Sequence, residues 1–265
     1  RIGTYKCYAC RKPFTVKVGT VFEASHVPMR KWLQAIFLMV SSKKGISSNQ
    51  LHRTLGVTLK TAWFMSHRIR EAMRDGDLSP LGGSGNIVEA DETYYGKKAE
   101  PYMSPQRKGR PFIHRGGAAN KRPILALVER NGSVRSFHIA QATKINVHQL
   151  VVDNVKRESV LYTDESKLYG GMRAQFRRHD TVHHSSGEYV RGTVHTNTIE
   201  NVFSVFKRGM KGTYQHCAEK HLHRYLAEFD FRYNSRVARG VDDEARADRA
   251  LRGVVGKRLT YQTTG

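Results

Sequence analysis

The chain has 265 residues, of which 39% are hydrophobic, and this length suits one substantial core with one or two small modules. Lysine and arginine number 45 against 23 aspartates and glutamates, which gives a formal net charge of +22 at pH 7. Such a surplus favours a polyanionic partner, above all nucleic acid. The longest strongly apolar run, residues 35–40, is far shorter than the ~20 residues that span a bilayer, so we expect no membrane partner.

The chain contains three cysteines, an odd number without a disulfide framework, which predicts a cytoplasmic protein, associated with the nucleoid if it binds DNA. Cys7 and Cys10 form a Cys-x-x-Cys pair flanked by basic and aromatic residues, as in one knuckle of a zinc ribbon. Zinc requires four ligands, so we expect residues 1–27 to be a partial ribbon whose other knuckle precedes Arg1. Free thiols or a redox turn are the alternatives.

Apolar residues recur at helical spacing between residues 28 and 74 and predict three short helices. Residues 47–63 have the pattern of a helix-turn-helix, with a glycine turn at Gly56 and a threonine cap before the second helix. In this interpretation the second helix enters a DNA groove and carries four basic side chains, Lys60, His67, Arg68 and Arg70. The alternative is a three-helix bundle with a solvated basic face.

Two apolar segments in the middle of the chain end in a carboxylate. Residues 86–91 lead to Asp91 and residues 159–164 lead to Asp164, and both alternate as buried strands do. Each aspartate is followed by a glutamate, Glu92 or Glu165, which we regard as an alternate ligand that the strand pattern disfavours. The two strands thus each deliver one carboxylate.

The residues before the first strand predict a linker, and those between the two strands predict a basic loop, a hairpin and a helix. The turn-forming stretch 75–85 indicates a domain boundary near residue 80, and Asn131-Gly132 indicates a tight hairpin turn. Residues 147–155 read as a helix. The stretch from Gly96 to Lys121 reads as a basic loop that either clamps DNA, through Arg107, Lys108 and Arg110, or is a solvated insertion.

A third acid, Glu200, lies in residues 198–207, where Ile199, Phe203 and Phe206 recur at helical spacing. Three carboxylates from three elements suit a pair of Mg²⁺ or Mn²⁺ ions, because hard cations prefer oxygen ligands. Two such ions about 3.5–4 Å apart activate an attacking oxygen and neutralise a leaving oxygen at phosphorus. The histidines at positions 179, 183, 184 and 195 offer a weaker hypothesis of a second metal.

The order of these elements is the layout of a ribonuclease-H-like domain, and the chain resembles insertion-sequence transposases of the ISXO-like group over nearly its whole length. The stretches that carry the resemblance are residues 5–14, 88–96, 162–164, 195–208, 212–216 and 231–234. The resemblance implies an α/β fold with four parts. These are the partial zinc ribbon (1–27), the helix-turn-helix module (28–80), a DDE catalytic domain (81–240) and a C-terminal tail (241–265).

The resemblance also implies Mg²⁺-dependent cleavage and strand transfer of DNA, with Asp91 and Asp164 as metal ligands. Related sequences have either Asn or Glu as the third member, and this chain offers Asn197 and Glu200; we favour Glu200 because a carboxylate is the stronger ligand. Lys207, seven residues later on the same helix face, would contact DNA phosphate, with Arg208 beside it.

The function expected from the resemblance is that of a DNA transposase that binds terminal inverted repeats and target DNA as a homodimer or larger assembly. Two alternatives stay open. One is a catalytically inert DNA-binding regulator, and the other is a ribonuclease-H-like nuclease that cuts without joining ends.

Overall fold

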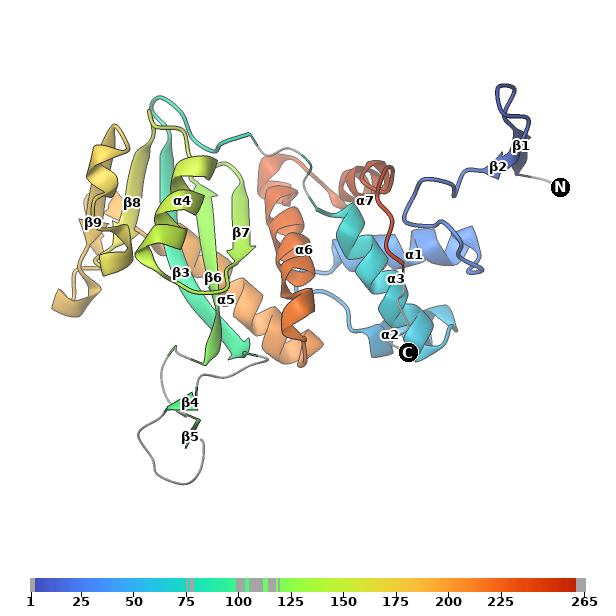
Figure 1. Ribbon diagram of the computed structural model, residues 1–265, viewed down its shortest axis with the longest axis horizontal. Helices are drawn as coiled ribbons and strands as arrows, with labels where there is room; N and C mark the ends of the chain where they lie inside the picture. Colours follow the sequence, from blue (N-terminus) through green and yellow to red (C-terminus); the bar gives the residue numbers. More distant parts are fainter. Residues whose placement is uncertain are drawn as a thin grey trace. The chain divides into compact units, whose positions relative to one another are not determined.

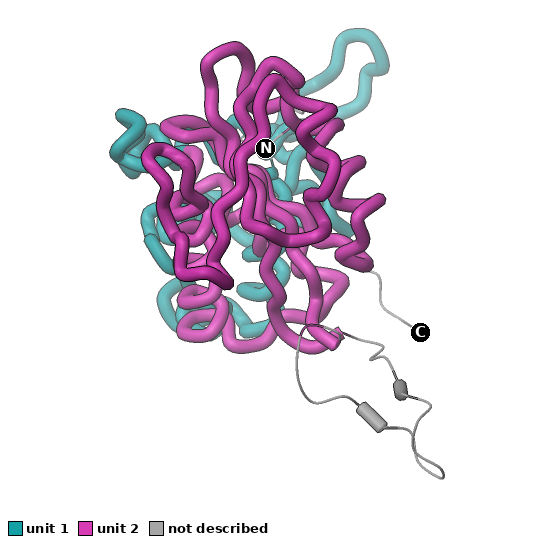
Figure 2. The backbone as a smooth tube through the Cα atoms, turned by 90° about the vertical axis from the view of Figure 1, so that its left-hand side faces the viewer, with its two compact units in different colours: residues 1–75, 235–265 teal, residues 76–234 magenta. Residues whose placement is uncertain are grey.

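The structure is a computed structural model that describes residues 3–74, 76, 79–98, 103–104, 112–113, 118 and 120–260. The chain divides into two compact units, which we call unit 1 (residues 1–75 and 235–265) and unit 2 (residues 76–234), as Figure 2 shows in two colours. No helix in the described part of the chain has the length and apolar character needed to cross a membrane.

Unit 1 begins with a short antiparallel hairpin and continues with helices. The hairpin strands are β1 (Thr4–Lys6) and β2 (Pro13–Thr15). The helices are α1 (Met29–Ser41), α2 (Ser48–Leu55), α3 (Leu59–Ala72), the short η6 (Val237–Arg239) and α7 (Asp243–Arg252). The three helices predicted over residues 28–74 are therefore present, and their apolar faces bury Trp32, Ile36, Leu51, Met65 and Ile69.

Local capping fixes the turn between α2 and α3. The Ser47 hydroxyl accepts a hydrogen bond from the Gln50 amide and starts α2, and Gly56 ends that helix in the left-handed region, with φ 57°. The Thr58 hydroxyl then accepts from the Thr61 amide and starts α3. Whether this pair of helices works as a helix-turn-helix on DNA stays a prediction.

The segment 235–265 belongs to unit 1, which differs from the tail expected over residues 241–265. Helix α7 packs against α1, and the amide of Val21 donates to the carbonyl of Val254. The buried Arg246 guanidinium donates to the carbonyls of Ser235, Val40 and Val241. The segment is thus held in unit 1 by α7, and Arg246 serves as an internal hydrogen-bond donor.

Unit 2 is built on a five-stranded mixed sheet in the order β7-β6-β3-β8-β9 (Figure 1). The strands are β3 (Ile87–Lys97), β6 (Lys121–Glu129), β7 (Val134–His138), β8 (Val160–Asp164) and β9 (Arg178–Val182). β3, β6 and β7 pair antiparallel, whereas β8 is parallel to both β3 and β9. The strand pairs β4 (Met103–Ser104) with β5 (Phe112–Ile113), and β10 (Val190–Arg191) with β11 (Val194–His195), lie outside this sheet.

Helices cover both faces of the sheet. They are α4 (Lys144–Asn154), α5 (Asn197–Gly209) and α6 (Leu222–Asn234). Short turns of helix connect the rest: η1 (Lys167–Tyr169), η2 (Met172–Ala174), η3 (His184–Ser186), η4 (Met210–Tyr214) and η5 (Glu219–His221).

Strand β6 shows why unit 2 has three layers. Leu125 and Leu127 pack with residues of α4, whereas Ile124, Ala126 and Val128 pack with residues of α5 and α6. Successive side chains of a strand point to opposite faces, so a strand that is apolar at every position needs a cover on both sides. The expected α/β class is confirmed.

Two predicted details of the sheet have different outcomes. The hairpin is present, with β6 and β7 joined through a turn in which Asn131 has φ 59°. The strand expected to end at Asp91 is longer, because β3 continues to Lys97 through pairing with β6 alone. Asp91 is therefore inside β3, although it lies beyond the last residue of β3 that pairs with β8.

Candidate active site

Asp91 and Asp164 occupy equivalent positions on two adjacent parallel strands. The pairing of β3 with β8 runs from Ile87 opposite Val160 to Glu89 opposite Tyr162, and each aspartate is two residues further along its strand. Because side chains alternate along a strand, both aspartates lie on the same face as the Glu89 and Tyr162 pair. The register of two strands thus places these two carboxylates side by side.

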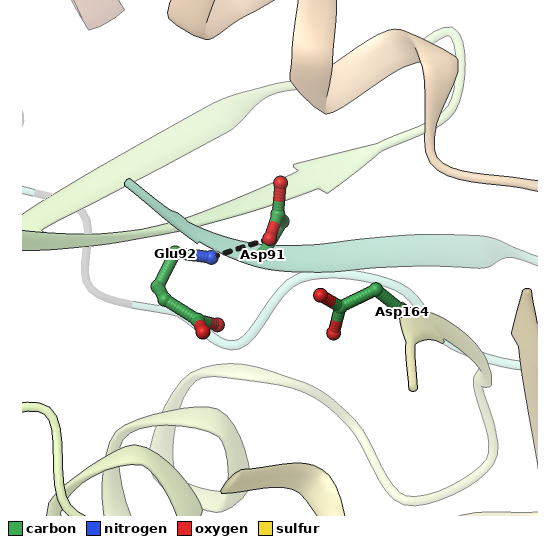
Figure 3. Close-up of side chains that lie close together, drawn as sticks. All are labelled: Asp91, Glu92 and Asp164. Atoms are coloured by element: carbon green, nitrogen blue, oxygen red, sulfur yellow. Dashed lines mark hydrogen bonds between the residues drawn. The ribbon is translucent and has the colours of Figure 1, made fainter. Parts of the chain in front are cut away.

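Asp91, Glu92 and Asp164 form one group of acids, in which one carboxylate oxygen from each residue lies within 4.8 Å of the others. Figure 3 shows Asp91 and Glu92 on opposite sides of β3 with Asp164 reaching the group from β8. The Glu92 amide donates to Asp91 Oδ1 at 2.7 Å. This oxygen-only donor set has the chemistry that Mg²⁺ and Mn²⁺ prefer.

Burial and mutual repulsion disfavour the ionised forms of these three acids. Burial raises the pKa of Asp91 well above its ordinary value, and the charges of Asp164, Glu92 and Glu200 raise it further. The pKa values of Glu92 and Asp164 are also raised, chiefly by burial. A divalent cation would relieve both effects, so the residues present fit such an ion.

Glu92 is a member of the acid group, which the sequence pattern did not indicate. Its carboxylate accepts hydrogen bonds from the buried Tyr169 hydroxyl at 2.7 Å and from Ser166 at 3.4 Å. Strand alternation assigns Glu92 to the face opposite Asp91, which is why it was disfavoured as a ligand. Its longer side chain nevertheless reaches the group.

Glu165, the other alternate, points elsewhere. Its carboxylate accepts hydrogen bonds from the amides of His184 and Ser185 at the start of η3. These amide bonds lower the pKa of Glu165 to about 2. The residue therefore caps a turn of helix and does not join the acid group.

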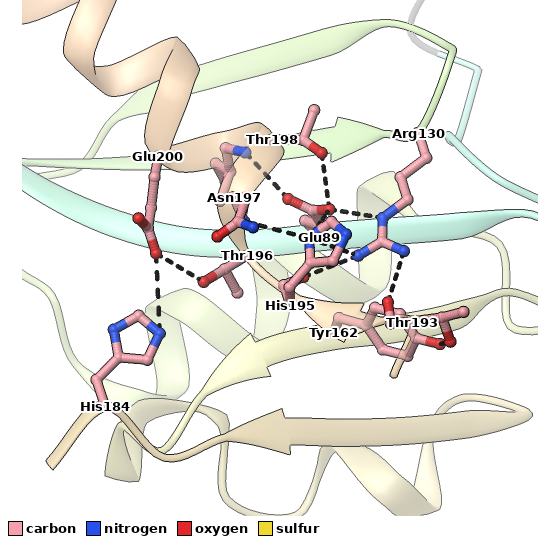
Figure 4. Close-up of polar contacts among 11 residues, drawn as sticks. Glu89, Arg130, Tyr162, His184, Thr193, His195, Thr196, Asn197, Thr198 and Glu200 are labelled. Carbon is pink, nitrogen blue, oxygen red and sulfur yellow. Dashed lines mark hydrogen bonds and ion pairs between the residues drawn. The ribbon is translucent and has the colours of Figure 1, made fainter. Parts of the chain in front are cut away.

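Glu200 lies in the first turn of α5 and is close enough for its charge to raise the pKa of Asp91. It accepts a hydrogen bond from the Thr196 hydroxyl at 3.0 Å and lies 3.8 Å from Nε2 of His184 (Figure 4). Asn197, Glu200, Lys207 and Arg208 are exposed on α5. Glu200 is thus a neighbour of the acid group, and Asn197 starts the helix that carries it.

Three of the four basic residues assigned to a DNA groove on α3 are inside the protein. Arg68 donates to the carbonyls of Val21 and Glu23 at 2.8 Å and of Leu259 at 3.1 Å. Arg70 donates to the Ser66 hydroxyl, and the His67 ring lies against Trp63. Since His67, Arg68 and Arg70 are all buried, the groove-facing assignment of these three is corrected, and Lys60 is the exposed member of the set.

Replacing Arg68 by methionine is expected to destabilise the protein, because three carbonyl groups would lose their donor. We expect the free energy of unfolding to fall by roughly 2–4 kcal/mol, as measured by denaturant titration. The matched change Lys60→Met, at an exposed position, should lower stability much less than Arg68→Met and weaken DNA binding at fixed salt. Normal stability with lost DNA binding in Arg68→Met would restore the groove-facing interpretation.

The remaining sequence-based site residues have separate outcomes. Arg107, Lys108 and Arg110 lie outside the described residues. Cys7 and Cys10 lie on the turn of the hairpin formed by β1 and β2, where hydrogen bonds from the turn lower the pKa of Cys7. Among the residues that the structure describes, Asp91, Glu92 and Asp164 are the one group of three or more side chains that could hold a metal ion, and neither a third ligand beside Cys7 and Cys10 nor a histidine group is found there.

Comparison with known proteins identifies the class of protein. The family model of the ISXO2-like transposase domain matches residues 80–234, which make up most of unit 2. The chain belongs to this family of transposases, as the resemblance indicated. An uncharacterised protein in transposable element ISH50 of Halobacterium salinarum is 32% identical over 235 residues, covering 86% of this chain and 77% of the relative.

Solved structures with some similarity include two complexes of the Mos1 transposase. The Mos1 strand transfer complex has a TM-score of 0.32 at 11% identity, covering 87% of this chain and 77% of that one. The Mos1 paired-end complex with the left transposon end has a TM-score of 0.32 at 12% identity, covering 88% and 77%.

Proposed function

We propose that this protein is a DDE-type DNA transposase that cleaves phosphodiester bonds at the ends of its element and joins them to target DNA. The single observation that carries the proposal is the pair Asp91 and Asp164 in register on parallel strands, grouped with Glu92, in a chain of the ISXO2-like transposase family. A net charge of +22 supports DNA as the partner.

The order of elements in unit 2 supports a ribonuclease-H-like catalytic domain. A strand with the first aspartate is followed by a hairpin, a helix, a second strand with an aspartate, another strand and a helix with the third acid. The third acid would be Glu200, because it is a carboxylate in the first turn of α5 and its charge acts on Asp91. Glu92 would be a further ligand.

Divalent cations held by Asp91, Asp164, Glu200 and Glu92 would activate the attacking oxygen and neutralise the leaving oxygen. Tyr169 orients Glu92 through its hydrogen bond, and the sheet register orients the two aspartates. The exposed Lys207 and Arg208 on α5 would hold the DNA backbone near the acids, and Lys60 of unit 1 would contact DNA elsewhere. Water would supply the attacking oxygen for cleavage, and the freed 3′ hydroxyl of the element end would supply it for joining, so the chain needs no covalent intermediate.

The test is a gel assay of the full chain with labelled DNA carrying the element's terminal inverted repeats, in Mg²⁺ or Mn²⁺. We expect nicked product followed by strand-transfer product, and neither in EDTA. Binding without cleavage in either metal would instead identify an inert DNA-binding regulator. Cleavage of structured DNA without any joining would identify a ribonuclease-H-like nuclease.

A further inference from the structure

A buried carboxylate lies directly behind the acid group and has no assigned role. Glu89 precedes Asp91 by two residues on the same face of β3, and its side chain is 0% exposed. A buried carboxylate is costly unless it is paired and hydrogen-bonded, so its partners indicate what it does. Its hydrogen-bond partners come from the hairpin turn and from the start of α5, and His195 Nδ1 of β11 lies 3.5 Å from Glu89 Oε1.

The first partner is Arg130, which follows β6. Its Nε donates to Glu89 Oε1 at 2.6 Å, and its other nitrogens donate to the carbonyls of Thr193 and His195. The guanidinium also lies over the Tyr162 ring, 4.9 Å from its centroid. Because Tyr162 is opposite Glu89 in the strand register, Arg130 contacts both residues of the layer that precedes the two aspartates.

The second partner is the N-terminus of α5. Glu89 Oε2 accepts from the Ile199 amide at 3.0 Å, and Oε1 accepts from the Thr198 hydroxyl at 2.9 Å (Figure 4). The first amides of a helix lack partners within the helix, and the N-cap residue ordinarily supplies an acceptor. Here the Thr196 side chain makes no capping bond and its hydroxyl donates to Glu200 instead.

We propose that Glu89, held by Arg130, caps α5 from the neighbouring strand and is the positioning residue that aligns Glu200 with Asp91. A carboxylate at a helix N-terminus also interacts favourably with the helix dipole. These two hydrogen bonds therefore join the strand that carries the first acid to the helix that carries the third. The proposal rests on Glu200 being the third acid of the proposed transposase.

The matched control is Glu228, another glutamate with a side chain that is 0% exposed and that pairs with an arginine, Arg232, on α6. Glu89→Gln and Glu228→Gln each remove a buried negative charge that is paired with an arginine. We therefore expect the Tm of both variants to fall. Only Glu89→Gln should speed amide hydrogen exchange in the peptide that covers residues 196–201. This readout requires neither cation nor DNA.

A double-mutant cycle then separates positioning from general damage. Glu89→Gln should lower cleavage by about 10- to 100-fold in the wild-type background and have little further effect in a Glu200→Gln background, because its effect passes through Glu200. The proposal would be overturned if amide exchange at 196–201 were unchanged in Glu89→Gln. It would also be overturned if the loss of cleavage in the double variant equalled the product of the losses in the two single variants. Absence of cleavage by the wild type would refute the proposed function, whereas the exchange experiment would still test the cap.

Discussion

Replacing Asp91 or Asp164 by asparagine is expected to lower the cleavage rate by at least about 10²–10³-fold while DNA binding persists. Each change keeps the shape of the side chain and removes one of the charges that would hold a divalent cation. The control is Asp153→Asn, which changes an exposed aspartate on α4. This variant should cleave DNA at the wild-type rate. Single-turnover cleavage and binding, measured on the same DNA, provide the comparison.

The same substitution at Asp91 should have the opposite effect on the stability of the cation-free protein. The folded protein raises the pKa of Asp91 above its ordinary value, chiefly by burial. The contribution of Asp91 to the free energy of unfolding is therefore fully present below the unfolded pKa of about 3.9. It is lost as the pH rises through the folded pKa. Asp91→Asn removes that loss, so we expect a higher Tm than wild type in EDTA at pH 7.5.

Adding Mn²⁺ should then raise the Tm of the wild type and leave that of Asp91→Asn nearly unchanged. A variant that cleaves normally, or that gains stability from Mn²⁺ as the wild type does, would show that Asp91 is not a ligand.

Replacing Glu200 by glutamine is expected to lower cleavage by about 10²-fold, the second-largest effect. Asn197→Ala should cost less, because an amide is the weaker ligand for a hard cation. Glu158→Gln, at an exposed position in the same unit, is the control. Normal cleavage by Glu200→Gln together with loss in Asn197→Ala would move the third ligand to Asn197.

Glu92→Gln tests the remaining acid through a different measurement. Since Glu92 is within 4.8 Å of the two aspartates, its loss should weaken Mn²⁺ binding to the DNA-free protein in calorimetry. If the affinity for Mn²⁺ were unchanged, Glu92 would not be a ligand, and its hydrogen bond with Tyr169 would be its role in the site.

The sequence was sufficient to predict the features that depend on local pattern. The alternation around Asp91 and Asp164, the Asn131-Gly132 turn and the apolar spacing of α5 each express a backbone period or a turn preference. The two aspartates are neighbours because both end an apolar run, and parallel strands bring such positions together. These features specify the sheet and two of the acids.

Features that depend on tertiary packing could not be predicted from the sequence. Arg68 was assigned to a DNA groove, and only the fold reveals the carbonyl groups to which Arg68 and Arg246 donate. Glu92 was disfavoured because alternation describes where a side chain starts, not how far it reaches. Glu89 had a signal, a charged residue at a buried position of an apolar strand, but its partners lie 41 to 110 positions away.

Unit 1 is assembled from two segments that are far apart in the sequence, and this has a consequence for synthesis on the ribosome. Unit 2 is continuous, so all of its strands and helices have been made once residue 234 has left the exit tunnel. Unit 1 waits for α7 and for the Leu259 carbonyl that accepts from Arg68, although α1, α2 and α3 are made before unit 2. Unit 1 therefore completes its core after unit 2 has been made, and synthesis through residue 259 is a condition for its assembly.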